Sequence, residues 1–180
     1  MTEYKEECFM KDISVKKITV AALFAALICA ATMAVRIPVP GTGGYIHPGD
    51  AAVILAGAFL NPAAAFLAAG LGSCMADLLG GYFVYVPVTF VIKGLVAWVM
   101  AFIYRYAVQK GKSRKMAVVF GGLADILLVA GGYFLCESLI YGPETALLGL
   151  SANGIQGISG LIIARILYPV LEHPLEYVYR

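Results

Sequence analysis

Long uncharged apolar runs are the feature that most limits how this chain can fold. The first of them, residues 18–35, contains no charged side chain, and an α-helix needs about 20 apolar residues to cross a bilayer. Of the 180 residues, 61% are hydrophobic and 13% are charged, whereas a typical soluble domain is about half apolar and about 25% charged. The chain is therefore predicted to be an all-α integral membrane protein without a separate soluble catalytic domain.

Six membrane-spanning helices are predicted from the apolar runs and from the Asn61-Pro62 break between the second and third of them. They cover residues 15–36, 50–60, 62–80, 87–106, 116–140 and 150–169. The first run lacks an A-x-A cleavage site, so we interpret it as a retained helix rather than a signal peptide. We expect residues 1–17 to be a cytoplasmic lead-in, 18–172 the membrane domain, and 173–180 a cytoplasmic tail.

The positions of lysine and arginine predict the orientation, because cytoplasmic loops carry an excess of these residues. Ten of the thirteen lie in the N-terminal region, in the segment 105–115 or at the C-terminus. Two passes through residues 50–80 put segment 105–115 on the same side as the N-terminus, whereas one pass would not. We therefore predict a bundle of six transmembrane helices with both termini cytoplasmic. The loops 37–49, 80–86 and 141–149 are then outside.

Small residues recur every fourth position on two predicted helices, which places them on one helix face. They are Ala22, Ala26 and Ala30 on the first helix, and Ala64, Ala68, Gly72, Ala76 and Gly80 on the third. In lipid, small residues let helix backbones approach closely. We interpret the stripe on the third helix as internal packing. For the first helix, packing within the bundle and contact with another protein both remain open.

Ionisable side chains within the predicted spans are costly in a bilayer and are therefore candidates for function. They are Asp77, Lys93, Asp125, Glu137 and Arg165. Lys93 lies at a similar predicted depth to Asp77 and Glu137, which predicts an ion pair with one of them; a contact with a ligand is the alternative. Asp125 lies deeper and is interpreted as structural. Asp50 is expected to cap the second helix.

A polar, glycine-rich strip, RIPVPGTGGYIHPGD, separates the first two apolar runs at residues 36–50. Irregular backbone at membrane depth is tolerated only where it is buried in protein or lines a cavity. We therefore interpret the strip as a lid over a small-molecule site, with a plain connector as the alternative. Tyr45 and His47 on the strip would then reach over a mostly apolar pocket with a few convergent polar groups.

Two amides near the start of the last helix add to this predicted site. Asn153 and Gln156 are three residues apart and share a helix face. Each amide can both donate and accept a hydrogen bond, which suits the ring nitrogens and hydroxyls of a heterocycle. Hydrogen bonding between helices is the alternative interpretation.

Motifs for catalysis are missing from the sequence. KGKSRK contains Gly-Lys-Ser, but Tyr106 stands where a phosphate-binding loop needs its first glycine, and neither H-E-x-x-H nor G-x-S-x-G occurs. The two histidines, His47 and His173, are predicted on opposite sides of the membrane. We therefore expect no catalytic residue, metal site or cofactor. A small intramembrane enzyme or a structural bundle protein is the remote alternative.

Four segments carry a resemblance to a known family. In chain order they are RIPVPGTGGYIHPGDAAVILAG, GLGSCMADLLGGYFVYVPVTFVIKGL, AGGYFLCESLIYG and NGIQGISG. They resemble the S components, the substrate-binding membrane subunits, of energy-coupling factor (ECF) vitamin transporters. The resemblance is strongest to the subgroup for hydroxymethylpyrimidine or pyridoxine, and riboflavin, folate, pantothenate and thiamine remain alternative substrates.

The resemblance implies a six-helix bundle in a bacterial plasma membrane that binds a vitamin near its outer face. It implies a transmembrane coupling protein and two ABC ATPases as partners, with no nucleic acid, and it implies that Ala22, Ala26 and Ala30 contact the coupling protein. The predicted ligand contacts are Tyr45, His47, Tyr85, Lys93, Tyr133, Glu137, Asn153 and Gln156, with Asp77 as an alternative to Glu137 for a ring N–H or hydroxyl.

Overall fold

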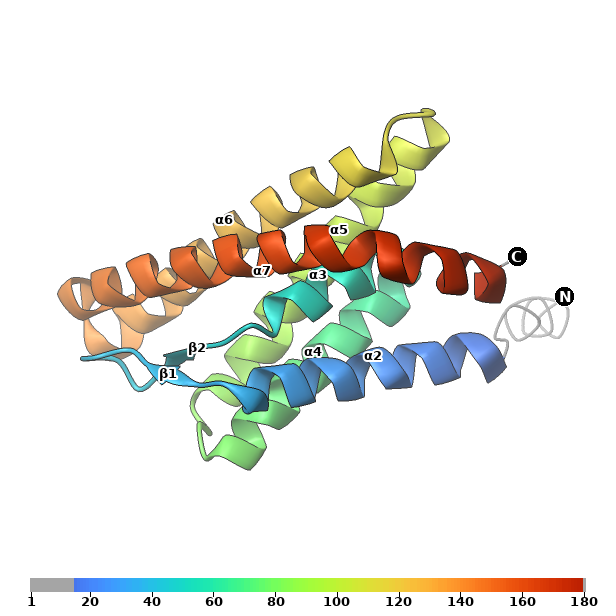
Figure 1. Cartoon of the computed structure of the whole chain (residues 1–180). Coiled ribbons are helices and arrows are strands. Elements are labelled where there is room, and N and C mark those ends of the chain that lie inside the picture. The colour runs from blue at the N-terminus through green and yellow to red at the C-terminus, as the bar shows by residue number, and fades with distance from the viewer. Residues whose placement is uncertain (1–14, 180) are drawn as a thin grey trace, which may run out of the picture.

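The computed structural model describes the backbone of residues 15–179 and the side chains of residues 15–174; most of the predicted lead-in lies outside this range. Six helices and one short hairpin occur within it (Figure 1). They are α2 (Val15–Ala34), β1 (Ile37–Pro38), β2 (Tyr45–Ile46), α3 (Asp50–Phe59), α4 (Pro62–Gly80), α5 (Tyr85–Gln109), α6 (Arg114–Tyr141) and α7 (Pro143–Tyr179). The predicted all-helical fold is confirmed. The hairpin within the polar strip was not predicted.

Five of the six helices are long and apolar enough to cross a membrane, and α3 is the exception among the described residues. Its 10 residues span about 15 Å at about 1.5 Å per residue, about half the hydrocarbon core. The predicted break before α4 is confirmed, because the Asn61 side chain accepts a hydrogen bond from the Ala64 N–H and Pro62 begins the helix. Residues 50–58 are all buried, so α3 lies inside the bundle.

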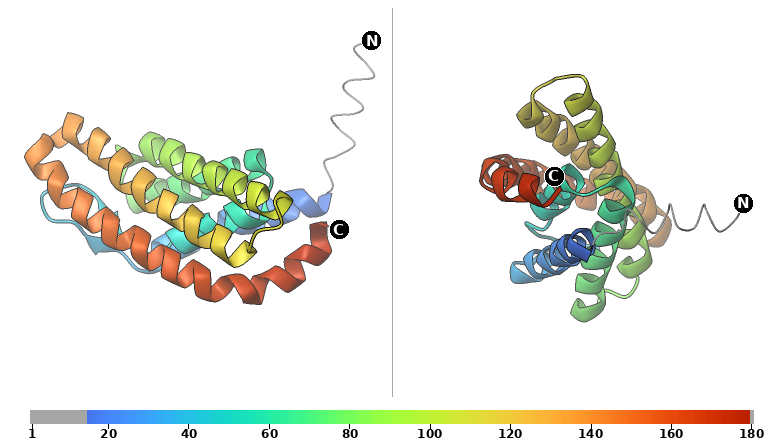
Figure 2. Two further views of the ribbon diagram at one scale, coloured as in Figure 1. Left: turned by 90° about the horizontal axis from the view of Figure 1, so that it is seen from above. Right: turned by 90° about the vertical axis from the view of Figure 1, so that its right-hand side faces the viewer.

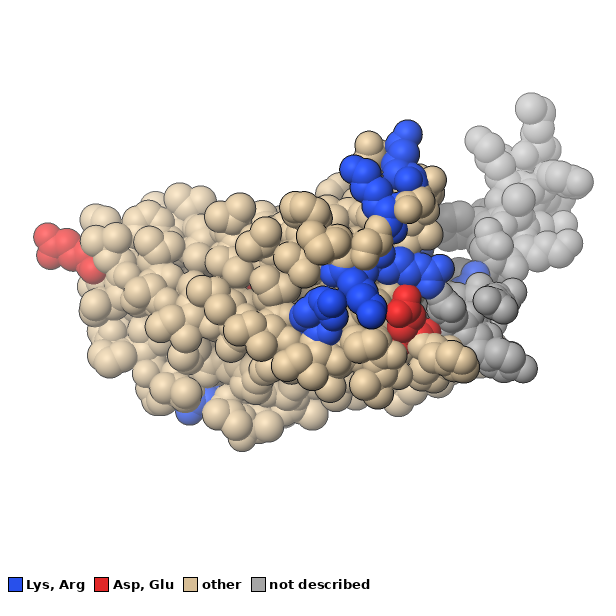
Figure 3. Space-filling model, turned by 45° about the horizontal axis from the view of Figure 1, so that its top comes forward, with Lys and Arg blue, Asp and Glu red and all other residues tan. Residues whose placement is uncertain are grey.

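The two ends of the bundle differ in what they carry (Figures 1 and 2). The start of α2, the end of α7 and the α5–α6 turn lie at one end, and the hairpin, the α4–α5 turn and the α6–α7 turn lie at the other. Most of the visible lysines and arginines gather toward the first end (Figure 3). We call it the basic end.

The last helix begins earlier and ends later than predicted. Gly142 alone separates α6 from α7, with a φ of +89° that glycine adopts readily, so the predicted outer loop at 141–149 is wrong. Pro143 can begin α7 because the N–H that proline lacks has no helical partner at that position. Pro169 and Pro174 lie inside α7, which curves along its length (Figure 2). Membrane helices tolerate such prolines where neighbouring groups satisfy the freed carbonyls.

Internal packing of the small-residue stripe on α4 is confirmed. Ala68, Gly72 and Ala76 are buried, and a Cβ atom added at Gly72 would overlap the carbonyl group of Ala25 on α2. The α2 and α4 backbones therefore touch at Gly72.

Replacing Gly72 by valine is expected to force α2 away from α4 and to destabilise the fold by about 1–3 kcal/mol or more, as overpacking does. Thermal unfolding of the purified chain in detergent measures the effect. Gly131→Val is the matched control, because Gly131 also lies inside a helix but has no atom within 4 Å of an added Cβ. Equal melting temperatures for the two variants would contradict the prediction.

The stripe on α2 behaves differently from the one on α4. Ala22, Ala26 and Ala30 are all exposed, whereas Phe24 and Ile28 point into the bundle. The first helix thus does not use these alanines to pack within its own chain.

Candidate functional site

A pocket lies under the hairpin, at the end of the bundle opposite the basic end. Its cavity volume is about 30 Å³, well below the about 300–1,000 Å³ typical of small-molecule sites, so the lining side chains fill most of the space. The pocket is lined by Thr32, Val39, Gly44, Tyr45, His47, Asp77, Tyr85, Thr89, Tyr133, Glu137, Asn153 and Gln156. The strip between α2 and α3 and five of the helices therefore contribute to one site.

Seven of the eight predicted site residues line this pocket, and Lys93 does not. Their role in binding stays a prediction. Sequence reasoning missed Thr32, Val39, Gly44 and Thr89. A single threonine in an apolar run forms no motif, so only the packing of α2 and α5 brings those two hydroxyls to the pocket.

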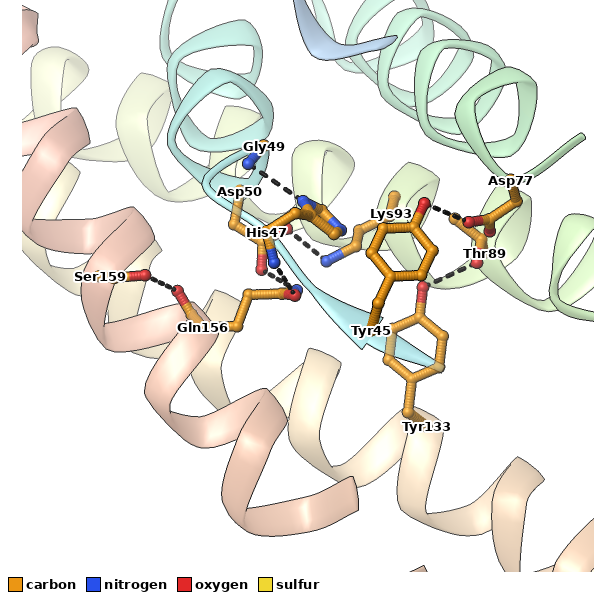
Figure 4. Close-up of polar contacts among 10 residues, drawn as sticks. All are labelled: Tyr45, His47, Gly49, Asp50, Asp77, Thr89, Lys93, Tyr133, Gln156 and Ser159. Carbon is orange, nitrogen blue, oxygen red and sulfur yellow. Dashed lines mark hydrogen bonds and ion pairs between the residues drawn. The ribbon is translucent and has the colours of Figure 1, made fainter. Parts of the chain in front are cut away.

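The hairpin holds Tyr45 over the pocket. β1 and β2 pair antiparallel, with Pro38 opposite Tyr45, and Gly41 in the turn has a φ of +84°. The Tyr45 hydroxyl donates a 2.7 Å hydrogen bond to Oδ1 of Asp77 on α4, as Figure 4 shows. Its ring also packs against Tyr82, with 4.4 Å between centroids. Tyr45 is thus one of the residues that attach the polar strip to the bundle.

Two carboxylates in the pocket each keep one oxygen unpaired. Oε1 of Glu137 accepts a 3.1 Å hydrogen bond from the Tyr85 hydroxyl, and Oδ1 of Asp77 is bonded to Tyr45. Oε2 of Glu137 and Oδ2 of Asp77 have no hydrogen-bond partner among the described residues. The pocket therefore presents acceptors to a ligand that carries N–H or O–H donors.

Lys93 lies below the pocket and pairs with Asp50, so the predicted pairing with Asp77 or Glu137 is wrong. Both side chains of the pair are fully buried. The expected capping role of Asp50 is also wrong: α3 has Gly49 at its N-cap with no side-chain cap hydrogen bond. The polar strip carries the start of α3 into the bundle, where a carboxylate needs a charged partner to offset its lost hydration.

Gln156 links this buried pair to the polar strip (Figure 4). Its Nε2 donates to Oδ2 of Asp50 at 2.8 Å, and its Oε1 accepts from the backbone N–H of His47 at 3.0 Å. Nδ1 of His47 in turn accepts from the Gly49 N–H at 3.0 Å. A continuous chain of polar contacts therefore runs from Lys93 to the lid.

The His47 ring is expected to make the stability of the chain depend on pH. Burial lowers the pKa of His47 to about 4, and the charges of Lys93 and Arg36 add to the effect while Asp50 opposes it. The neutral ring is also the form whose Nδ1 can accept the Gly49 N–H. Because the unfolded chain has a histidine pKa of about 6.5, this stability is complete above about pH 6.5 and is lost as the pH falls toward about 4.

We therefore expect His47→Asn, which keeps an acceptor near the Nδ1 position, to lose less thermal stability than the wild type between about pH 7 and about pH 5. Melting temperatures of both proteins across this range measure the effect. Subtracting one curve from the other removes the contribution of titrating groups that both proteins share. Parallel curves for the two proteins would contradict the prediction.

Comparison with known proteins bears on what the pocket is for. Residues 12–173 match the family model described as ECF-type riboflavin transporter, S component. An uncharacterised protein in the gap 3′ region of Pyrococcus woesei is 32% identical over 132 residues, covering 73% of this chain and 85% of that protein. The thiamine precursor transporter HmpT of Lactococcus lactis subsp. cremoris (strain MG1363) is 27% identical over 164 residues, covering 91% of this chain and 92% of HmpT.

The family resemblance predicted from the sequence is confirmed, and the similarity to HmpT is consistent with the predicted subgroup. The five long apolar helices agree with a multi-pass protein of the cell membrane. Its class is a transport subunit rather than an enzyme. Taken with the pocket under the hairpin, the match over residues 12–173 shows that the chain belongs to the family of ECF-type riboflavin transporter S components.

Proposed function

We propose that this chain captures a small water-soluble vitamin precursor of the hydroxymethylpyrimidine type from outside the cell. The pocket carries the proposal, because the unpaired oxygens of Asp77 and Glu137 and the Asn153 amide converge there. An aminopyrimidine offers N–H and O–H donors to the carboxylates and ring nitrogens to the amide. Its flat ring suits the surrounding tyrosines. The similarity to a thiamine precursor transporter supports this ligand class.

Riboflavin is the second candidate, because the matching family is described by that vitamin. A three-ring flavin with its sugar-alcohol chain needs more room than a single pyrimidine. The cavity volume of about 30 Å³ supports the smaller ligand, because the lining side chains have to move less to admit a single ring. Pyridoxine, which also has one ring, fits the same argument.

We place the pocket on the outer side of the membrane and both termini in the cytoplasm. The positive-inside rule supports this orientation, since segment 105–115 carries five lysines and arginines. The short helix α3 takes the chain from the hairpin on the outer side back toward the cytoplasmic side, where α4 begins. The chain then crosses the bilayer six times, with the polar strip and α3 together making one of the crossings.

Inward transport on this proposal uses ATP hydrolysed by two ABC ATPases and transmitted through a membrane coupling protein. Ala22, Ala26 and Ala30 form the proposed contact with that protein. Their exposure on α2 supports the assignment, because small side chains on an open helix face let a second helix approach closely in lipid.

Ligand binding by the purified full chain in detergent tests the proposal. We would titrate hydroxymethylpyrimidine, pyridoxine, thiamine, riboflavin, folate and pantothenate and follow thermal unfolding, because a ligand that binds only the folded state stabilises it in proportion to ln(1 + [L]/Kd). The largest shift is expected with hydroxymethylpyrimidine. A larger shift with riboflavin would favour the second candidate, and no shift with any compound would contradict vitamin binding at this site.

A further inference from the structure

A second hollow lies far from the pocket, between the end of α5 and the start of α6. Its floor is made of two small buried residues, Ala107 and Ala117, with 8% and 2% of their surface exposed. Its walls are large apolar side chains that stay exposed by about half of their surface, namely Phe102 at 49%, Tyr106 at 59%, Met116 at 50% and Phe120 at 57%. We call this hollow the α5–α6 groove. Its empty volume, open side included, is about 940 Å³.

Positive charge surrounds one end of the α5–α6 groove. Lys112 and Ser113 line it at the turn between the helices, and the Lys110 ammonium lies 5.9 Å from the centre of the Tyr106 ring. Segment 105–120 contains no aspartate or glutamate. One acidic side chain does approach from α7: Glu172 accepts a 3.2 Å hydrogen bond from Arg114. The groove is therefore apolar along its length and cationic at its mouth.

The groove also continues into the apolar outer surface of the bundle. Along α5, exposed Trp98 precedes Phe102, and their rings make an edge contact at 4.5 Å between centroids. Along α6, exposed Leu123 follows Phe120. These two helix faces lead away from the basic end toward the bilayer core. A molecule with a long hydrocarbon chain could thus leave the groove directly into the membrane.

We propose that the α5–α6 groove binds one anionic phospholipid from the leaflet at the basic end. An acyl chain lies on the alanine floor between Phe102 and Phe120, and the phosphate lies against Lys110 and Lys112. The charge pattern selects this occupant: basic groups between membrane helices attract anionic lipid head groups, and the stems of lysines pack on apolar surface while their ammonium groups reach the head-group layer. A zwitterionic lipid would gain the apolar contacts but little from the lysines.

Trp98 allows a direct test in the intact chain, because it is the only tryptophan in the sequence and lies one helical turn from Phe102. The full chain would be reconstituted with acyl-brominated phosphatidylglycerol or acyl-brominated phosphatidylcholine at equal mole fractions, and quenching of Trp98 fluorescence would be compared. We expect the anionic lipid to quench at several-fold lower mole fraction. Equal quenching by the two lipids would overturn the proposal.

The double variant Lys110→Gln/Lys112→Gln is expected to reduce the preference for the anionic lipid by on the order of 5-fold for each lysine removed. Lys16→Gln/Lys17→Gln is the matched control, because it removes two charges from the same end of the bundle on α2, outside the groove. If Lys110→Gln/Lys112→Gln kept the preference for the anionic lipid, the proposal would be overturned. An equal loss of preference in both double variants would also overturn it, because the attraction would then come from the overall charge of the basic end and not from the groove. Relief of quenching by soluble glycerol phosphate would show that the head group alone is bound, which also overturns it.

Discussion

Replacing Lys93 by methionine is expected to destabilise the folded chain by about 3–5 kcal/mol, the cost of breaking a buried ion pair by removing one partner. Asp50 would keep its charge inside the bundle with Gln156 as its remaining polar contact. Chemical or thermal unfolding in detergent measures the change.

Removing both charges should restore most of this stability. In Lys93→Met/Asp50→Asn, the amide oxygen introduced at position 50 can still accept the Gln156 hydrogen bond, and no unpaired charge remains. If the double variant were no more stable than the single one, the two side chains would not be energetically coupled. Ligand binding by the double variant also separates two roles of Lys93. Near-normal ligand affinity would support a structural role beneath the pocket. A double variant that is stable but no longer binds the ligand would show a direct ligand contact.

Replacing Glu137 by glutamine together with Asn153 by alanine is expected to weaken ligand binding by about 100-fold. Hydrogen bonds contribute about 1 kcal/mol when neutral and about 1.5–3 kcal/mol when one partner is charged, and each 1.4 kcal/mol is about tenfold in affinity. Titration with the compound that gives the largest thermal shift measures the loss. Unchanged affinity would show that the site assignment is wrong.

Stability of the folded chain should change little in this double variant. The glutamine keeps an acceptor for the Tyr85 hydroxyl, and the second Glu137 oxygen has no partner to lose within the described residues. Glu144→Gln/Ser151→Ala is the matched control, because it makes a similar change on exposed positions of α7 outside the pocket. Its affinity should equal that of the wild type.

The sequence by itself determined the class of the protein and most of its helices. An uncharged apolar run long enough to cross a bilayer is rarely found in a soluble protein. Asn61-Pro62 marks the start of a helix by its local chemistry alone, without any tertiary contact. The polar strip and the polar residues in or beside the apolar runs also predicted seven of the residues that line the pocket. Polar residues inside the runs cannot face lipid cheaply and must point inward.

Only the tertiary structure decided which of these polar residues meet. The partner of Lys93 depends on how deeply α3 enters the bundle, and that depth is set by a hairpin of two-residue strands too short to leave an alternating pattern. The end predicted for the last helix at residue 169 is likewise wrong, because α7 continues through Pro169. Capping residues and prolines act over one or two helical turns. The pairing of buried charges instead depends on packing between segments that are far apart in sequence. Each buried charge needs a partner that compensates its lost hydration, and only the packed structure decides which partner that is.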